Sequence, residues 1–267
     1  MATFGFIGTG NMGGALARAL RKNVSGKEIE LTNRSIEKAD ALASELCCYI
    51  TPSNEKIAAE ATYIFLGVKP QMMGDLLAEL APVLKARQDR FILVTMAAGL
   101  TIQRIRKIAG GDYPVIRIMP NTPASIGEGM ILYTSSGDIA PHELEVFLTS
   151  MQGAGRLSPL PEHLMDAGSA VSGCGPAVVA LFIEALAAGG VACGLPRASA
   201  LEFAAQMVAG SAKLILESGK HPGELKDAVC SPGGTTIQGV RALEAVNFRG
   251  TVMEAVIKAY EKNFDLK

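Results

Sequence analysis

The sequence has few histidines and no excess of either charge. Its 25 lysines and arginines are balanced by 26 aspartates and glutamates, which gives a formal net charge of -1. Without a basic excess the chain has little electrostatic attraction for nucleic acid or anionic lipid, so we expect a small-molecule partner and no nucleic acid or membrane. The three histidines, His142, His163 and His221, have no cysteine or carboxylate at metal-ligand spacing, and no metal site is predicted.

Paired cysteines, an export signal and a long apolar run are also missing. The five cysteines are odd in number and lack the spacing of a zinc site or a disulfide framework, which fits a reducing cytoplasm. The first apolar residues, 4–7, are typical of a strand and not of the core of a signal peptide. The most apolar stretch, residues 178–193, is shorter than the ~18 residues of a spanning helix and contains Glu184. We therefore expect a cytoplasmic protein in which this stretch is a buried helix.

The first part of the chain predicts an α/β domain. Of the 267 residues, 49% are hydrophobic, and domains usually span roughly 100 to 200 residues, so two domains are expected. Up to residue 160, short apolar runs alternate with amphipathic helical patterns, as in βαβ units around a doubly wound, mostly parallel sheet. The expected strands are residues 3–7, 28–32, 62–66, 91–95 and 114–119, and the expected long helices are 11–22 and 36–46. Residues 1–160 are thus predicted to form a Rossmann-type domain.

The second part, residues 161–267, predicts an all-α domain. Strand patterns stop there, and helical patterns rich in alanine, leucine and methionine follow. Pro176, Pro196 and Pro222 mark helix starts, because the missing N–H of proline would be unpaired in the first turn anyway. Apolar side chains in residues 178–183 and 201–215 occupy more than one helical face. Packing within one chain could cover some of them, but we expect an obligate homo-oligomer, a homodimer or larger.

A glycine-rich turn follows the first expected strand. In such a turn the first glycine permits the tight bend, the second lets the backbone approach a pyrophosphate, and the third lets the helix pack on the strand. The N–H groups that open the following helix then face the phosphates. The predicted cofactor contacts in this turn are Gly8, Thr9, Gly10, Asn11, Met12 and Gly13. The alternative is an ordinary strand-turn-helix with no ligand.

The residues after the second expected strand indicate which dinucleotide is bound. A carboxylate there hydrogen-bonds the ribose 2′-hydroxyl of NAD and repels a 2′-phosphate. Asn33, Arg34 and Ser35 take this place, and Arg34 offers a planar fork to a phosphate while Ser35 adds a hydroxyl. Ser35 is also well placed as a helix N-cap. NADPH is therefore favoured as the cofactor, and NADH is possible but less favoured. The alternative is an Arg34 that contacts only solvent.

Three further loops follow strands at the same expected edge of the sheet. Ligands of such sheets bind in a crevice at the carboxyl ends of the strands, and small residues in the loops leave room for a nicotinamide. The predicted contacts are Val68, Lys69, Pro70, Ala97, Ala98, Gly99 and Asn121. The alternatives are that Lys69 is a solvated charge and that the prolines only end strands.

The most specific motif lies late in the chain. Residues 231–236 read Ser-Pro-Gly-Gly-Thr-Thr, and residues 172–177 read Ser-Gly-Cys-Gly-Pro-Ala. Along nearly its whole length the sequence resembles the pyrroline-5-carboxylate reductase family, and the first segment is similar to that family's signature. The second segment differs from the family's pattern by Cys174 in place of a serine. The resemblance implies an NAD(P)H domain, a helical domain that dimerises, and a cofactor contact at Asn54, which otherwise reads as a turn residue.

The resemblance implies NADPH-dependent reduction of 1-pyrroline-5-carboxylate to L-proline, the last step of proline biosynthesis. That chemistry needs a hydride from the nicotinamide, a hydrogen-bond partner at the imine nitrogen and a cradle for the carboxylate. A helix expected to begin near Thr235 offers N–H groups to an anion, and the resemblance implies that Thr236 contacts the nitrogen as the catalytic residue. The predicted substrate-binding residues are Ser231, Gly233, Gly234, Thr235 and Thr236. The alternative is that Thr235 is a plain N-cap.

Two other functions are compatible with a Rossmann domain followed by helices. A 3-hydroxyacid dehydrogenase uses a lysine in a glycine-rich helix start, and residues 168–186 contain no lysine, so that alcohol oxidation lacks its usual base. A non-catalytic NADP-binding sensor would have no use for an intact residue 231–236 loop. Both are disfavoured by the sequence.

Overall fold

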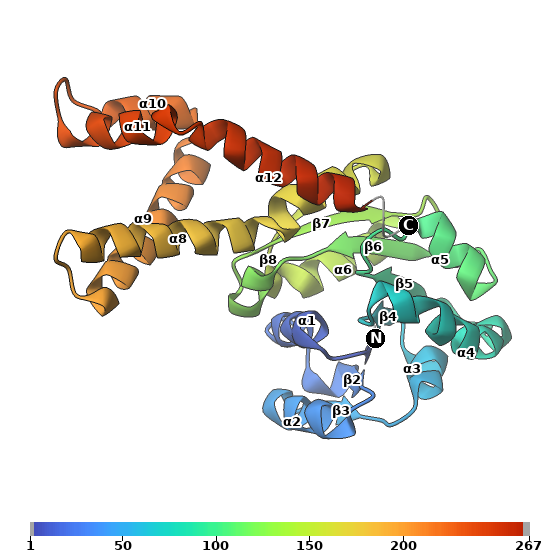
Figure 1. Ribbon diagram of the computed structural model, residues 1–267. Coiled ribbons are helices and arrows are strands. Elements are labelled where there is room, and N and C mark those ends of the chain that lie inside the picture. Colours follow the sequence, from blue (N-terminus) through green and yellow to red (C-terminus); the bar gives the residue numbers. More distant parts are fainter. Residues whose placement is uncertain (1–2, 264–267) are drawn as a thin grey trace. The chain divides into compact units, whose positions relative to one another are not determined.

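The computed structural model describes residues 3–263 and divides the chain into two compact units (Figure 1). The first contains the residues up to Cys174 together with those from Ala259 onward, and the second is Gly175–Lys258. The contacts between residues thus place the division after Cys174, whereas the sequence predicted a boundary at residue 160. Residues 162–174 are helical, but they belong to the unit that contains the sheet. The domain boundary at residue 160 stays a prediction.

The first unit is built on an eight-stranded sheet in the order β3-β2-β1-β4-β5-β6-β7-β8. All neighbouring strands are parallel except β6 and β7, which are antiparallel. The strands are β1 Phe4–Ile7, β2 Ile29–Thr32, β3 Tyr49–Ile50, β4 Tyr63–Leu66, β5 Ile92–Thr95, β6 Val115–Met119, β7 Gly129–Ser135 and β8 Gly155–Pro159. The predicted α/β Rossmann-type sheet is confirmed. Each of the five expected strands begins one residue later than predicted, and β3, β7 and β8 were not predicted.

Helices follow most strands of this unit. They are α1 Asn11–Arg21, α2 Ile36–Leu46, α3 Asn54–Glu60, α4 Met73–Ala86, α5 Ile102–Ala109, α6 Pro141–Met151 and α7 Met165–Gly168. The expected helix at 36–46 is found with these bounds, and the one at 11–22 ends one residue earlier. The sequence therefore predicted the bounds of the first two helices closely and gave no bounds for the other five.

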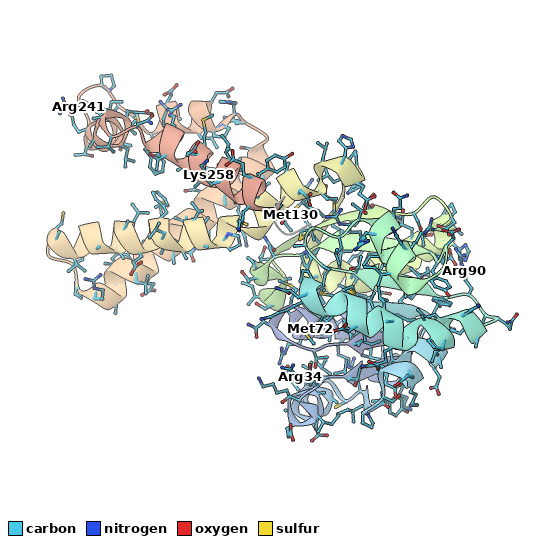
Figure 2. All side chains as sticks on the ribbon, turned by 45° about the vertical axis from the view of Figure 1, so that its right-hand side comes forward. Arg34, Met72, Arg90, Met130, Arg241 and Lys258 are labelled. Carbon is cyan, nitrogen blue, oxygen red and sulfur yellow. The ribbon has the colours of Figure 1, made fainter. Side chains whose placement is uncertain are left out.

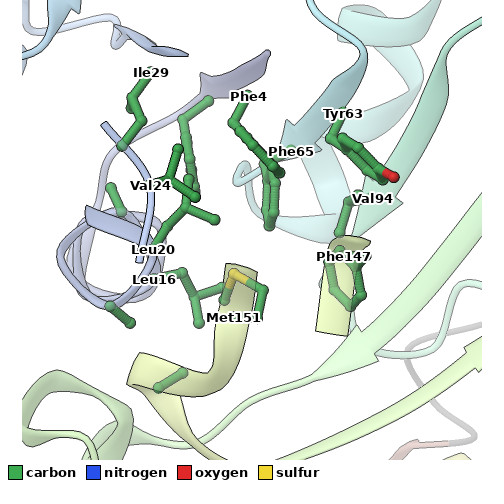
Figure 3. Close-up of a cluster of buried hydrophobic side chains, with 14 of the residues drawn as sticks. Phe4, Leu16, Leu20, Val24, Ile29, Tyr63, Phe65, Val94, Phe147 and Met151 are labelled. Atoms are coloured by element: carbon green, nitrogen blue, oxygen red, sulfur yellow. The ribbon is translucent and has the colours of Figure 1, made fainter. Parts of the chain in front are cut away.

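The core fills both faces of the sheet because successive strand residues point to opposite sides. On one face Phe6 and Phe65, which are register partners in β1 and β4, stack with ring centroids 4.3 Å apart. Leucines of α1 and Phe147 and Met151 of α6 cover them (Figure 3). On the other face, Ile64 and its neighbours meet apolar residues of α3, α4 and α5. Two apolar layers thus support the sheet edge from which the loops extend.

An ion pair secures the start of α6. The Glu143 carboxylate accepts hydrogen bonds from Arg90 at 2.8 and 2.9 Å and from the Ala140 N–H at 2.8 Å. These donors, Arg90 first, lower the pKa of Glu143 to about 2. Its carboxylate therefore stabilises the fold above its ordinary pKa, and that contribution is lost as the pH falls from about 4.5 towards 2.

We expect Glu143→Gln to lower the free energy of unfolding by about 1 kcal/mol at pH 7, since it loses a charge-assisted cap and ion pair. Denaturant unfolding at pH 7 and at pH 3 measures the free energy of unfolding. The difference between the variant and wild type should be smaller at pH 3. The matched control is Glu145→Gln, an exposed carboxylate on the same helix. A gap of the same size at both pH values contradicts the assignment.

The second unit is helical, as predicted. Its helices are α8 Gly175–Ala192, α9 Arg197–Ser218, α10 Pro222–Ala228, α11 Thr235–Ala245 and most of α12, Phe248–Lys262. Pro176 and Pro222 lie in first turns as expected, whereas Pro196 is the N-cap that precedes α9. That correction is small, because an N-cap also needs no intrahelical N–H partner.

This unit buries very little of its own apolar surface. Of residues 175–258, three are buried: Ala187 of α8 and Ala200 and Ala204 of α9, where the two helices pack. Large apolar side chains remain exposed, with Leu181 67% and Phe203 57% accessible. By length and composition the helical stretch Glu162–Ala192 could cross a membrane, and 6% of its most apolar window is buried in the single chain. The stretch predicted to be a buried helix is therefore largely exposed in the single chain.

Candidate active site

The glycine-rich turn between β1 and α1 is shaped by close backbone contacts. Gly8 has φ +94°, and its N–H donates to the Thr32 carbonyl at 2.9 Å. A Cβ at Gly13 would lie 2.2 Å from the Gly8 carbonyl oxygen, and one at Gly67 would lie equally close to it. Any side chain at these positions would push α1 or the loop after β4 away. The glycines therefore hold the two central loops of the sheet edge together.

The same turn leaves space and polar groups free for a ligand. Apart from Gly10 itself and its two chain neighbours, no heavy atom of residues 3–263 lies within 4 Å of a Cβ built at Gly10. As the N-cap of α1, Gly10 supplies no side-chain acceptor to the first N–H groups. Thr9 is 8% exposed, and its buried Oγ1 has no hydrogen-bond partner among residues 3–263. Buried hydroxyls are normally paired. An open approach, unpaired helix N–H groups and an orphaned hydroxyl fit a bound dinucleotide phosphate.

The site lies at the point where the strand order reverses. β1 and β4 are neighbours in the centre of the sheet, although α1 leads from β1 to one side and α4 from β4 to the other. In open α/β sheets the ligand crevice forms outside the carboxyl ends of the strands at such a point. The loops after β1, β2, β4, β5 and β6 all begin at this edge, because these strands are parallel. The predicted cofactor residues of those loops are thus brought to one edge.

The loop after β2 presents a cation without a carboxylate partner. Arg34 is exposed (Figure 2), and it makes no hydrogen bond or ion pair with another described residue. Ser35 is the N-cap of α2, as predicted, but its hydroxyl accepts no capping hydrogen bond and stays available. The Asn33 amide donates to the Ser35 carbonyl at 3.1 Å and shapes the loop. A guanidinium and a free hydroxyl at this place suit a phosphate.

The other predicted cofactor residues fall into two groups. Those in the loops after β4 and β5 line the edge: Val68, Lys69 and Pro70, with Lys69 exposed, and Ala97, Ala98 and Gly99. The two asparagines already have partners. Asn54, at the start of α3, donates to Glu79 at 3.1 Å. Asn121 accepts from the Met130 N–H at 2.9 Å and donates to the Ser172 carbonyl at 3.0 Å. The side-chain amides of Asn54 and Asn121 thus help to hold the segments around them in place.

The residue 231–236 turn lies in the second unit and opens α11. Gly233 has φ +69°, a conformation that favours glycine, and the Gly234 N–H donates to the Ser231 carbonyl at 3.0 Å. Gly234, not Thr235, is the N-cap of α11, so the alternative of Thr235 as the cap is wrong. Thr235 and Thr236 are the first two helical residues, and both are exposed. With no side chain at the cap, the first N–H groups of α11 are free to bind an anion.

Sequence reasoning missed a buried ionic group beside this edge. Arg117 lies in β6, is 1% exposed, and contacts Glu162 at 3.4 Å and Asp166 at 3.1 Å. The signal was an arginine inside an otherwise apolar strand, Val115–Met119, because buried arginines are rare unless paired. No group of three or more histidine, cysteine, aspartate or glutamate side chains among residues 3–263 is placed to hold a metal ion.

A Rossmann-type sheet with a glycine-rich turn after β1, followed by a helical unit, fits the class of NAD(P)-dependent oxidoreductases. A family model described as NADP oxidoreductase, coenzyme F420-dependent, matches residues 3–99, and one described as pyrroline-5-carboxylate reductase dimerisation matches residues 162–266. The chain belongs to the pyrroline-5-carboxylate reductase family, because relatives of that name are 41% identical to it over 97% of its length or more.

Relatives match over nearly the full length. The pyrroline-5-carboxylate reductase of Synechocystis sp. is 41% identical over 264 residues, which is 98% of this chain and 97% of the relative. That of Escherichia coli is 41% identical over 261 residues, 97% of this chain and 96% of the relative. A crystal structure of Plasmodium falciparum pyrroline carboxylate reductase with NADP bound has a TM-score of 0.89 at 31% identity and covers 99% of this chain and 98% of that one.

Proposed function

We propose that the protein catalyses the NADPH-dependent reduction of 1-pyrroline-5-carboxylate to L-proline, the last step of proline biosynthesis. The observation that carries this proposal is the turn at residues 231–236, where Gly234 caps α11 and leaves the first two residues of that helix exposed. The full-length relatives of the chain are pyrroline-5-carboxylate reductases. The substrate is a small cyclic imine with a carboxylate. It needs a hydrogen bond at nitrogen and an anion site, and both can come from this one turn.

The chemistry divides between cofactor and protein. When bound, NADPH would supply a hydride for the imine carbon, and the imine nitrogen would carry a proton. The N–H groups of Thr235 and Thr236 would hold the carboxylate, with Ser231, Gly233 and Gly234 shaping the turn around it. The Thr236 hydroxyl would hydrogen-bond the imine nitrogen and orient the ring. No strong base is required, which agrees with the absence of lysine from residues 168–186.

NADPH is proposed as the preferred cofactor, with NADH less favoured. Arg34 has no carboxylate partner among residues 3–263, and the Ser35 hydroxyl is unused by its own helix, so both can bind a 2′-phosphate. The pyrophosphate would lie on Gly8 to Gly13, where the orphaned Thr9 hydroxyl finds a partner. The nicotinamide would lie towards Ala97, Ala98, Gly99 and Asn121.

We expect Arg34→Glu to raise KM for NADPH at least ~10-fold and KM for NADH less than ~2-fold, because a carboxylate repels the 2′-phosphate alone. Steady-state kinetics with both cofactors measure this. Lys38→Glu is the matched control, since it makes the same charge change at an exposed position of the adjoining helix. Equal effects on both cofactors would mean that Arg34 does not face the 2′-phosphate.

The helical unit is proposed to form a homodimer or larger homo-oligomer. The dimerisation model covers residues 162–266, and the exposed apolar side chains of α8 and α9 supply a surface for a second copy. We accordingly assign the apolar stretch of α8 to the core of that assembly and not to a membrane. A cytoplasmic location stays a prediction from the cysteine content.

A substrate comparison distinguishes the proposed function from the two others. NADPH oxidation is measured with 1-pyrroline-5-carboxylate, and NADP+ reduction is measured with 3-hydroxy acids. We expect turnover only with the cyclic imine. Faster turnover of 3-hydroxy acids would indicate a hydroxyacid dehydrogenase, and NADPH binding without turnover of either would indicate a sensor.

A further inference from the structure

Three side chains from β6 and the residues just after it contact the helical residues 162–172. Arg117 and Met119 are two residues apart in β6 and point to the same side of the sheet, and Asn121 follows two residues after the end of the strand. Arg117 contacts Glu162 and Asp166, Met119 shares a buried cluster with Met165, and Asn121 donates to the Ser172 carbonyl. We call this row of contacts the β6 seam. It fixes a helical segment along a strand at three successive points.

The charged end of the β6 seam is built around a buried cation. The Arg117 side chain is 2% exposed, and its Nε has no partner among the described residues, while the side chains of Asp166 and Glu162 are 13% and 32% exposed. An arginine in such a place needs its carboxylates to offset the cost of leaving water. Glu162 and Asp166 are therefore both held opposite Arg117 in β6. Any displacement of the helical segment along β6 would leave the guanidinium unpaired.

The β6 seam also contacts the proposed cofactor loops. The Glu162 carboxylate accepts the Ile102 N–H at 2.7 Å and so holds the start of α5, which follows the residue 96–101 loop. Ala98 packs against the cluster of Met119 and Met165. One set of side chains thus links the loop after β5, the end of β6 and the segment that leads to Cys174.

The segment on the β6 seam carries a π-helical turn at its end. Residues Ser169–Gly173 form this turn, and the Cys174 N–H donates to the Ser169 carbonyl at 3.0 Å. π-turns have a wider hydrogen-bond pattern than α-helix and occur often at functional sites. The turn begins the 172–177 motif. Its position relative to the nicotinamide loops is set by the β6 seam.

We propose that Arg117 is a positioning residue for imine reduction: through Glu162 and Asp166 it holds the residue 169–174 turn in place beside the cofactor loops. This role rests on the proposed function and adds a residue that contacts neither substrate nor cofactor. A misplacement of about 1 Å in such a framework can cost up to ~100-fold in rate. The loss should appear in the chemical step and not in cofactor affinity.

The test compares Arg117→Met, Arg117→Lys and Glu162→Gln in the full-length protein. We expect kcat to fall about tenfold or more for Arg117→Met and about fivefold for Glu162→Gln, with the Kd for NADPH changed less than ~2-fold. Arg117→Lys, which keeps the charge but not the fork that reaches both carboxylates, should recover part of the kcat lost in Arg117→Met. NADPH fluorescence gives Kd, and hydrogen exchange should show faster exchange of the 169–174 amides in Arg117→Met and Glu162→Gln.

Arg106→Gln is the matched control. Arg106 also joins a carboxylate, Asp138 at 2.7 Å, to a backbone carbonyl, that of Tyr113, but it leaves the β6 seam untouched. It should lower the melting temperature and leave kcat within about twofold. The proposal would be overturned if the Arg117 and Glu162 variants had lower melting temperatures but kept the wild-type kcat and the wild-type hydrogen-exchange rates of the 169–174 amides. A wild-type protein inactive on the imine would contradict the proposed function instead, and the exchange data would still decide whether Arg117 holds the turn.

Discussion

Replacing Thr236 with alanine is expected to lower kcat/KM for 1-pyrroline-5-carboxylate about 100-fold, which corresponds to about 3 kcal/mol of transition-state stabilisation. The hydroxyl lies on the second residue of α11, beside N–H groups that no side chain caps. At this position it can contact the nitrogen of a substrate whose carboxylate those N–H groups hold. Steady-state kinetics measure the loss, and NADPH titration should give an unchanged Kd.

Two comparisons separate a role in the reaction from a role in the fold. Thr236→Ser keeps a hydroxyl and should recover kcat/KM to within about tenfold of wild type. Thermal melting of Thr236→Ala should stay close to wild type, because Gly234 is the N-cap and Thr236 is exposed. A normal rate with a lowered melting temperature would show that the hydroxyl stabilises the helix and takes no part in the reaction.

A charge on the exposed apolar surface of α8 is expected to abolish assembly. Leu181 is 67% exposed in the single chain, and we propose that a second copy covers it. Burying an aspartate there costs ~3 kcal/mol or more per copy, which weakens association more than ~100-fold. Light scattering should report a dimer or larger for wild type and a monomer for Leu181→Asp, with at least tenfold lower activity.

The control for this variant is Val146→Asp, which places the same charge on an exposed apolar position of α6 in the first unit. It should leave both the assembly and the activity unchanged. A wild-type protein that is a stable, active monomer would contradict the proposed assembly. The cover of α8 would then have to come from another source.

The sequence could predict five strands, β1, β2, β4, β5 and β6, because each is a short apolar run and all but β6 are followed by a crossover helix. β7 and β8 were missed for identifiable reasons. β7 returns antiparallel to β6 after a 3-10 turn, Thr122–Ile126, so no crossover helix separates the two strands. β8 is an edge strand that ends in Pro159, with mixed exposure. β3 has two residues, too few for any period to be visible.

Some features of the candidate site could be predicted from the sequence, and others could not. The glycine-rich turn and Arg34 could be found because their neighbours in sequence define their setting. The β6 seam could not, since the partners of Arg117 lie 45 and 49 residues further along the chain. The sequence shows an unusual arginine within β6, but only the folded chain shows which carboxylates it contacts.

The proposed reaction is tested most directly by the fate of the hydride. NADPH carrying deuterium at both C4 positions is oxidised in the presence of 1-pyrroline-5-carboxylate, and the product is identified by mass spectrometry and NMR. Hydride transfer to the imine carbon predicts L-proline with one deuterium on the ring carbon bonded to nitrogen and distant from the carboxylate. Cofactor oxidation without proline, or proline without deuterium at that carbon, would contradict the proposed function.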